Sequence, residues 1–418
     1  MAKEKFPDGT LIDEWFYDCS CPQLENCGKQ YCITDYGVFA DGKVYTEQIQ
    51  KLIDSAAQSG GGVIVVPNGT YLTGALFFRQ GVNLYLAPNA ILKGSDDISD
   101  YPVCETRIEG ETCLYYPAII NVDGVDGFVV FGGGIIDGNG LKAWKAFWQR
   151  RKWNENCTNK DEQRPRLLYI SNSKNVTVFG VRLQNSPFWT SHIYKCSRVK
   201  FIDSNIFAPR SPVPAPSSDA IDIDACSDVL IKRCYMEVND DAVVLKGGKG
   251  PWADEDQTNG ANERVLVEDC EFGFCHSALT LGSECVHSKN ILVRRIKLNG
   301  ILQLLHLKLR PDTPQLYEYI TVEQVEGRVV DKFINVSPWT QFFDLKGRED
   351  KPISIAQQIK IKDCNCTCDC FFSVVADEKN YRLRDFTLEN IKVKTRDKGN
   401  DFSAIEGIAL SGVEVQTE

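Results

Sequence analysis

The sequence lacks several features that would point to common protein classes. It contains no uninterrupted run of 18 apolar residues, so no segment is predicted to span a membrane. It has no excess of basic residues, because 47 Lys and Arg against 57 Asp and Glu give a net charge of −10. This balance argues against a nucleic-acid partner. The first ten residues, MAKEKFPDGT, lack the apolar centre of a signal peptide. The chain is therefore expected either to be cytoplasmic or to have lost such a peptide.

Seventeen cysteines are present, and the odd number leaves at least one thiol unpaired unless it pairs between chains. Four of them, Cys364, Cys366, Cys368 and Cys370, alternate in the segment CNCTCDC. Alternate residues of a strand share one face, and no His lies nearby in the sequence. Packing or a local disulfide is therefore favoured over the alternative of a metal site, and no metal is predicted.

The chain divides into segments with different patterns. Residues 1–30 are rich in turn formers and predict an extended N-terminal arm. Residues 47–58 have helical periodicity, with Thr46 as a candidate cap and Gly60–Gly62 ending the helix. Short apolar runs bounded by Gly, Pro, Asn or Asp then predict strands. Residues 141–166 are polar and aromatic and predict a short helix and loop outside the strand pattern.

A repeat of 23 to 39 residues occupies the second half of the chain. Each repeat starts with an apolar strand residue after a polar turn, namely Val176, Val199, Val229, Val265, Ile291, Ile320, Ile359 and Phe386. Five residues further on, the side chains are all small or medium and mostly apolar: Val181, Ser204, Cys234, Cys270, Ile296, Val325, Cys364 and Ile391. Such a column is what stacked coils of a solenoid require.

The repeat predicts an all-β fold, a right-handed parallel β-helix formed by residues 31–418 as a single catalytic domain. The helix at 47–58 would cap the open N-terminal end, since uncapped strand edges invite aggregation. Cys234, Cys270 and Cys364 are then expected to point into the core. A β-sandwich or propeller is the alternative, but either would show more even spacing.

Polar residues that could carry chemistry fall on four consecutive coils. They are Asp219, the pair Asp240 and Asp241, His276 and Lys308. Neighbouring coils lie about 4.8 Å apart, so these residues should meet. A bulge would turn both members of the Asp pair to one side; an ordinary turn is the alternative for that dipeptide.

Clustered carboxylates with a His and a Lys are typical of glycoside hydrolysis. One acid protonates the leaving oxygen, and the opposite carboxylates activate a water molecule. Packing like charges together favours one protonated member near neutral pH. The Lys would hold the carboxylate of an acidic sugar.

These motifs resemble glycoside hydrolase family 28, the polygalacturonases and rhamnogalacturonan hydrolases. The family pattern corresponds to Ser217-Ser218-Asp219, Asp240-Asp241, Cys275-His276-Ser277 and His306-Leu307-Lys308, and the resemblance covers about residues 31–345. It implies that Asp240 is the general acid, that Asp219 and Asp241 activate water with inversion, and that His276 supports the acid. It further implies a set of substrate-binding residues: Lys308, Arg310, His306, Trp189, His192 and Asn239.

Departures from the pattern bear on the substrate. Ser217 replaces an Asn, and His306 replaces an Arg, which removes a fork-shaped carboxylate donor. The spacing from His276 to Gly282 matches exo-acting bacterial members. The resemblance therefore implies an exo-acting enzyme on galacturonate-containing pectic polysaccharide or oligosaccharide, with a rhamnogalacturonan hydrolase as the alternative.

Two other classes stay open from the sequence. A polysaccharide lyase would bind calcium through Asp240 and Asp241, and a non-catalytic β-helix would bind carbohydrate without turning it over. For the hydrolase no cofactor is expected, the oligomeric state is open, and a periplasmic or extracellular location with a trimmed signal peptide is expected, with the cytoplasm as the alternative.

Overall fold

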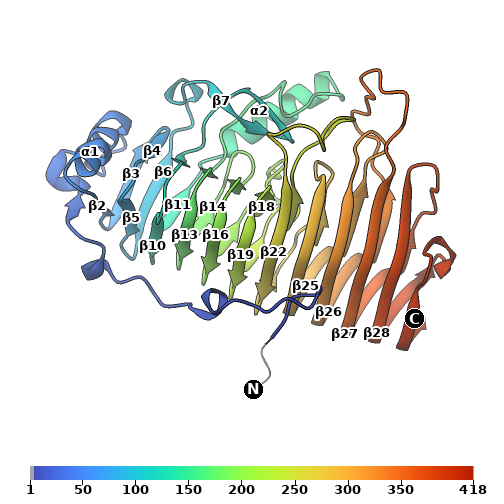
Figure 1. Ribbon diagram of the computed structural model, residues 1–418. Coiled ribbons are helices and arrows are strands. Elements are labelled where there is room, and N and C mark those ends of the chain that lie inside the picture. Colours follow the sequence, from blue (N-terminus) through green and yellow to red (C-terminus); the bar gives the residue numbers. More distant parts are fainter. Residues whose placement is uncertain (1–3, 418) are drawn as a thin grey trace.

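Parallel pairing links each stretch of the chain to the stretch one coil further along (Figure 1). The computed structural model describes residues 4–417, and 27 of its strands form one continuous sheet. The sheet winds into a right-handed parallel β-helix, which confirms the fold expected from the repeat.

Three faces make up each coil, and each face is a stack of short parallel strands. The first face contains β1 (Gln30–Cys32), β2 (Gly62–Val66), β5 (Val82–Leu86), β10 (Val129–Gly132), β13 (Lys174–Phe179), β16 (Ser197–Ile202), β19 (Ser227–Lys232) and β22 (Ala261–Glu268). The second contains β3 (Gly69–Thr73), β6 (Ala90–Gly94), β11 (Ile135–Asp137), β14 (Arg182–Gln184), β17 (Asn205–Phe207), β20 (Tyr235–Glu237) and β23 (Glu271–Phe272). The third contains β4 (Leu76–Phe78), β9 (Ile120–Asp123), β12 (Leu168–Ser171), β15 (Ser191–Tyr194), β18 (Ile221–Asp224), β21 (Val243–Lys246) and β24 (Ser277–Leu281).

Longer strands continue the faces toward the C-terminus. They are β25 (His287–Leu309), β26 (Leu316–Pro338), β27 (Ser354–Val374), β28 (Tyr381–Gly399) and β29 (Ala409–Thr417). The first of these pairs with β22, β23 and β24 in turn, so one strand bends around all three faces.

Single residues with positive φ bend the chain at the corners. One set lies directly before the repeat positions, as at Asn175, Asp228 and Asn290, and another lies four residues after them, as at Asp203 and Asp269. Asn and Asp tolerate the left-handed region better than other non-glycine residues, because their short side chains hydrogen-bond locally. These corner residues are the polar turns that delimit each repeat in the sequence.

The predicted repeat register is confirmed residue by residue. All eight repeat positions from Val176 to Phe386 pair with their predicted neighbours on the adjoining coils. Cys234, Cys270 and Cys364 are each 2% exposed and point into the core, as expected. Cys366 and Cys368 are buried on the same side of β27, and all 17 thiols are free, so packing accounts for the CNCTCDC segment.

The helix α1 (Thr46–Gln58) covers the N-terminal end of the solenoid (Figure 1). Its apolar side Ile49, Leu52, Ile53 and Ala56 is buried in the main core. Thr46 is not its cap, contrary to expectation. Tyr45 is the capping residue, and the Thr46 hydroxyl instead accepts a hydrogen bond from the Gly74 amide at 2.6 Å.

Residues 4–29 form an arm along the outside of the first face (Figure 1). It contains the short 3-10 helices η1 (Glu14–Tyr17) and η2 (Leu24–Asn26). Phe6, Ile12 and Phe16 pack on outward apolar residues of four successive coils: Ile202, Leu230, Leu266 and Leu292. The arm is therefore fastened across the coils by its own small apolar cluster.

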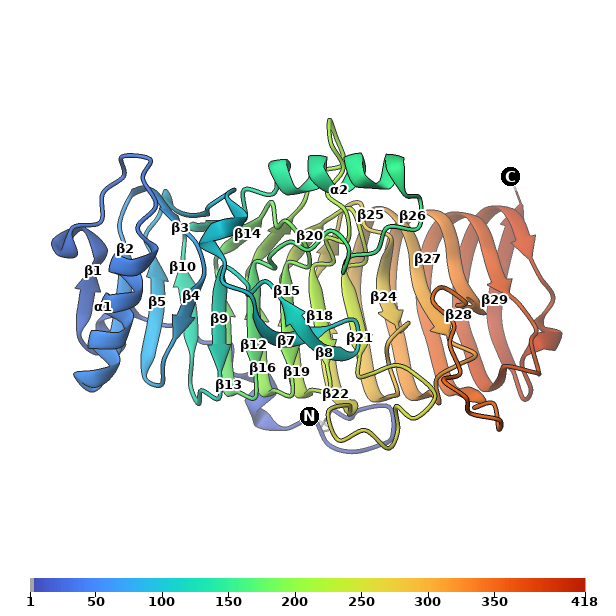
Figure 2. The same cartoon turned by 90° about the horizontal axis from the view of Figure 1, so that it is seen from above.

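Two insertions lie at the third face, one over it and one along its edge. The hairpin β7 (Cys104–Ile108) and β8 (Glu111–Tyr115) is antiparallel, and α2 (Leu141–Trp153) lies along the same side of the solenoid (Figure 2). The helix confirms the interruption predicted at 141–166. It is anchored by indole N–H groups, since Trp144 donates to the Ser186 carbonyl and Trp148 to the Pro214 carbonyl.

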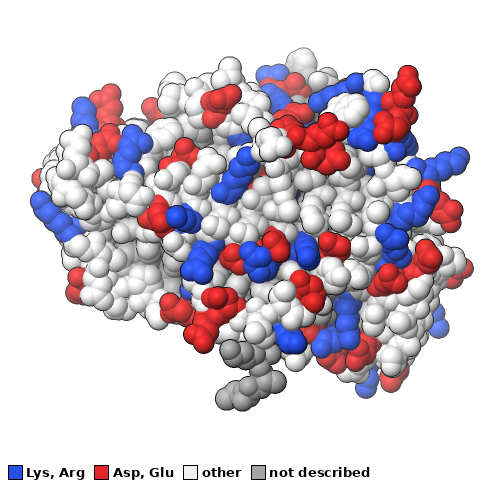
Figure 3. Space-filling view, in the orientation of Figure 1, with Lys and Arg blue, Asp and Glu red and all other residues white. Residues whose placement is uncertain are grey.

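Three further 3-10 helices are η3 (Ile33–Tyr36), η4 (Ile98–Asp100) and η5 (Phe402–Ala404). Within residues 4–417, neither α-helix has the length and apolar character needed to cross a bilayer. Acidic and basic side chains are interspersed over the face shown in Figure 3, rather than gathered by sign.

Candidate active site

The residues predicted to carry chemistry meet on the third face. Asp219 lies two residues before β18, Asp241 two residues before β21, and His276 directly before β24. Lys308 lies near the end of β25. Because β18, β21, β24 and β25 are consecutive neighbours in the sheet, these side chains occupy four successive coils, as predicted.

The environment of the Asp pair differs from the expected bulged strand. Asp240 and Asp241 lie in the bend between β20 and β21, outside both strands. The chain passes here from the second face to the third, so alternation along a strand does not apply. A corner, and not a bulge, therefore allows both adjacent carboxylates to face the same pocket.

A pocket of about 460 Å³ contains this cluster. Of the predicted catalytic and substrate-binding residues, those that line it are Asp219, Asp240, Asp241, His276, His306, Lys308, Arg310 and Trp189. Insertions form the rest of its wall, through Phe147 and Arg151 of α2, Asn159 of the following loop, and Glu109 of the hairpin. The β26 side contributes Trp339.

Asp240 and His276 form the most exposed pair of the site. The His276 Nδ1 atom lies 3.3 Å from the Asp240 Oδ1 atom, and the side chains are 41% and 25% exposed. Burial lowers the pKa of His276, but the hydrogen bond to Asp240 and the charges of Asp240 and Asp241 together outweigh it, so the pKa is raised above its ordinary value. This contact supports the predicted pairing of acid and histidine.

Asp241 and Lys308 form a buried ion pair. Their charged atoms lie 2.7 Å apart, and Asp241 is 2% exposed. Burial favours a higher pKa of Asp241, but Lys308, with His306 and His276, holds it well below its usual range. Asp241 is therefore an ionised carboxylate, and the ammonium predicted to bind substrate already has a protein partner.

Asp219 belongs to a second cluster around Lys246. The Lys246 Nζ atom lies 3.9 Å from Asp219, 3.4 Å from Asp222 and 3.5 Å from Glu284. Burial, together with the neighbouring Asp240 and Asp222 charges, raises the pKa of Asp219 well above its ordinary value. Burial also raises the pKa of Asp222 to about 7.

Sequence reasoning did not single out Lys246 and Glu284, although both line the pocket. Lys246 pairs in register with Asp224 of the preceding coil, so strand alternation from Asp222 could have placed it on the outer side. Burial lowers the pKa of Lys246, but Asp222, Glu284 and Asp219 outweigh it and raise that pKa. Lys246 is thus the counter-charge for three acids.

His192 does not line the pocket, which corrects the prediction from the resemblance. It is fully buried, with Nδ1 at 2.6 Å from Arg166 Nη1 and Nε2 at 3.3 Å from Asp224 Oδ2. Burial lowers its pKa to about 4, so the ring is neutral. The hairpin explains the difference, because Arg107 of β7 reaches Asp224 at 3.2 Å and covers this part of the face.

Asn239 is also a supporting residue and does not line the pocket. The backbone N–H of Asn239 donates to the Ser218 hydroxyl at 3.1 Å, and its side-chain amide donates to the Ala215 carbonyl at 3.0 Å. It therefore holds the loop that carries Asp219, in place of the predicted contact with substrate.

Arg310 lines the pocket with its charge already satisfied. Its guanidinium makes two hydrogen bonds to Asp312, at 2.8 and 2.7 Å, and is 3% exposed. His306 is 7% exposed, and burial with the nearby Lys308 charge lowers its pKa to about 3. Neither residue offers a free positive charge to a ligand.

The described residues, 4–417, contain no group of three or more His, Cys, Asp and Glu side chains arranged to hold a metal ion. The carboxylates of the pocket are paired instead with Lys246, Lys308, His276 and Lys249.

Comparison with known proteins finds similarity over the part of the chain that holds most of the site. A family model for glycosyl hydrolases family 28 matches residues 102–303. The chain is 27% identical over 227 residues to a probable polygalacturonase of Vitis vinifera, covering 52% of this chain and 44% of that protein. It is 26% identical over 284 residues to an endo-polygalacturonase of Pectobacterium parmentieri, covering 64% and 65%. The chain thus spans less than two thirds of the length of these relatives.

A hyperthermoactive exopolygalacturonase from Thermotoga maritima has the same fold. Its structure matches with a TM-score of 0.77 at 20% identity, covering 96% of this chain and 95% of that chain. The family match includes Asp219, Asp240, Asp241 and His276. Over the coils that carry these residues, the chain is similar to family 28 of the glycosyl hydrolases.

Proposed function

We propose that the protein is an inverting glycoside hydrolase that removes units from the end of a galacturonate-containing pectic polysaccharide or oligosaccharide. The observation that carries this proposal is the meeting of three carboxylates from two adjacent coils in one pocket, each with different partners. Glycosidases of this kind need one carboxyl group that gives a proton and another that takes one.

In the proposed reaction Asp240 is the general acid. It faces the pocket beside His276 and is the most exposed of the three acids, so its proton can reach the glycosidic oxygen. Asp241 is the general base, because Lys308 keeps it ionised, and it takes a proton from the attacking water. The water oxygen bonds to the anomeric carbon as the bond to the leaving oxygen breaks. Asp219 helps to orient that water.

Action at a chain end is supported by the insertions around the pocket. Phe147 and Arg151 of α2, Asn159 of the next loop and Glu109 of the hairpin close one side of it. A groove closed at one side accepts a terminus better than the middle of a polymer. The relatives include an endo-acting enzyme, so this part of the proposal depends on the shape of the pocket.

Rhamnogalacturonan is the alternative substrate, and one observation favours it. His306 is neutral and Arg310 is paired with Asp312, so the wall near Lys308 has few free cations. A uniform polyuronate carries a carboxylate on every sugar and would need more of them. A chain of alternating acidic and neutral sugars would need fewer.

Product analysis on homogalacturonan and on rhamnogalacturonan I tests both versions. Chromatography with mass spectrometry should find saturated products from one of the two, and proton NMR should show an inverted anomeric configuration at first release. A metal chelator should leave the rate unchanged. An unsaturated product, or activity lost to the chelator and restored by calcium, would instead identify a lyase.

A further inference from the structure

Four cationic side chains line the pocket, and three of them are engaged by acids of the protein. Lys308 pairs with Asp241 at 2.7 Å, and Arg310 makes its two bonds to Asp312. Lys246 lies within 3.9 Å of three carboxylates. An anionic sugar entering the pocket would have to compete with these acids for each of the three.

Arg151 is the fourth cation, and its charge is uncommitted. It lies in the last turn of α2, half-buried, with its guanidinium carbon 5.5 Å from the centre of the Phe147 ring. Among residues 4–417 no acid or acceptor forms an ion pair or hydrogen bond with it. A guanidinium fork kept near an aromatic face and without a partner is well suited to receive a carboxylate from a ligand.

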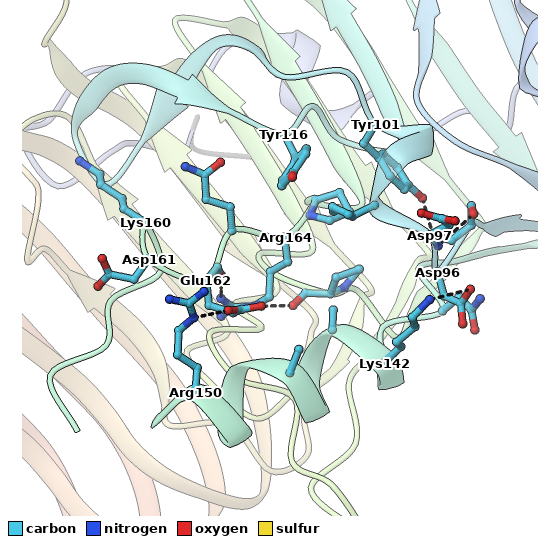
Figure 4. A pocket seen from close by; sticks show the side chains of 18 residues that line it. Asp96, Asp97, Tyr101, Tyr116, Lys142, Arg150, Lys160, Asp161, Glu162 and Arg164 are labelled. Carbon is cyan, nitrogen blue, oxygen red and sulfur yellow. Dashed lines mark hydrogen bonds and ion pairs between the residues drawn. The ribbon is translucent and has the colours of Figure 1, made fainter. Parts of the chain in front are cut away.

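Another side of the same helix shows the contrast. There a second pocket of about 460 Å³ is lined by Lys142, Arg150 and Lys160, among others (Figure 4). Each of these cations has an acidic partner: Asp96 for Lys142, Glu162 for Arg150 and Glu111 for Lys160. The helix therefore carries adjacent arginines, of which Arg150 is matched and Arg151 is free.

We propose that Arg151 is a specificity-determining residue that binds the carboxylate of the galacturonate unit lying against α2. This inference rests on the proposed function for the nature of the substrate. Recognition of the acidic group then shifts from the end of β25 and the residue after it, where Lys308 pairs with Asp241 and Arg310 with Asp312, to the insertion that lines one side of the pocket. The chemistry is a charge-assisted, two-pronged hydrogen bond.

The test compares Arg151→Gln with Arg150→Gln on a galacturonate trimer and on its fully methyl-esterified counterpart. The measured quantity is kcat/KM for the acid divided by kcat/KM for the methyl ester. Arg151→Gln removes the charged donor that would bind the acid, so this ratio should fall by roughly 10- to 100-fold. The change should appear mainly in KM. Arg150→Gln should keep the wild-type ratio, and Arg151→Lys should fall between, because it keeps the charge without the fork.

A ratio that is unchanged in Arg151→Gln, or that falls equally in Arg150→Gln, would overturn the proposal. If the wild type cleaves neither pectic substrate, the proposed function fails, and calorimetric titration with the galacturonate trimer decides the role of Arg151. Weaker binding by Arg151→Gln alone would uphold it, and equal or absent binding would overturn it. With an active enzyme the same titration is done in an Asp240→Asn background, and thermal unfolding of all variants checks the fold.

Discussion

Asp219, Asp240 and Asp241 are one residue type in three electrostatic settings. Lys308 holds the pKa of Asp241 low, whereas burial beside other acids raises the pKa of Asp219. Asp240 is partly exposed and contacts the partly exposed His276. Groups whose surroundings push their pKa values apart are suited to opposite proton transfers, so the three acids should respond differently to substitution.

Asp240→Asn should abolish turnover and leave the fold intact. The amide is nearly isosteric and sits at a partly exposed corner, but it has no proton to donate. Loss of general acid catalysis should lower kcat by roughly 10²- to 10⁴-fold. Steady-state kinetics and thermal unfolding should be measured together. Normal folding with retained activity would remove Asp240 from the mechanism.

Lys308→Met should move the acid limb of the pH profile. Asp241 must be ionised to accept a proton, and Lys308 keeps its pKa low. Without the ammonium, burial should raise that pKa, so the fall of kcat/KM on acidification should begin about 1 to 3 pH units higher. Lys297→Met, an exposed change in the same strand, is the control. An acid limb that stays in place in the variant would argue that Asp241 is not the base.

Some site residues could be read from the sequence, while others depended on tertiary context. The spacing of Asp219, Asp240, His276 and Lys308 matched consecutive coils, so their meeting followed from the repeat. His192 lies on the same face, and only the β7–β8 hairpin, which the repeat does not reveal, shows that it is covered. The partners of Arg310 and Lys246 likewise depend on where buried acids converge.

At the scale of the elements, the repeat was predictable because stacking of the coils restricts the size and polarity of the side chains between them. Every coil places a side chain directly above another, and the column from Val181 to Ile391 must stay small or medium and mostly apolar to keep the coils in contact. Residues with positive φ at the corners form the polar turns that separate the repeats. The hairpin, α2 and the arm pack individually and follow no repeat, so the periodicity of the sequence could not predict where they pack.

Cys270→Asp should destabilise the solenoid strongly. Cys270 is 2% exposed, and its Sγ atom lies 3.5 Å from the Cys234 amide in the neighbouring coil. An unpaired carboxylate there should lower the free energy of unfolding by more than about 3 kcal/mol. Urea unfolding followed by circular dichroism measures it, with the exposed change Cys21→Asp as control. Similar midpoints for both variants would contradict the assigned stacking.

At the scale of the whole molecule, the solenoid supplies a regular surface, and the insertions give it a site. The coils on the third face align the acids, while the hairpin lies over that face, α2 runs along its edge, and both contribute to the pocket wall (Figure 2). The two are coupled by anchors such as Trp144 and Trp148, which fix α2 to the loops before Trp189 and Asp219. These anchors therefore hold α2, and with it one wall of the pocket, in place against the coils.

This arrangement predicts that the enzyme acts from a chain end. The α2 helix and the loop after it close one side of the pocket, so a long polymer should enter only by its terminus. Time-resolved chromatography of a long pectic substrate should give a monosaccharide, or one short product, from the first time point. Viscosity should fall slowly, because the remaining chains stay long. An early ladder of mixed oligosaccharides with a rapid loss of viscosity would mean that the wall leaves the groove open, and that cleavage occurs inside the chain.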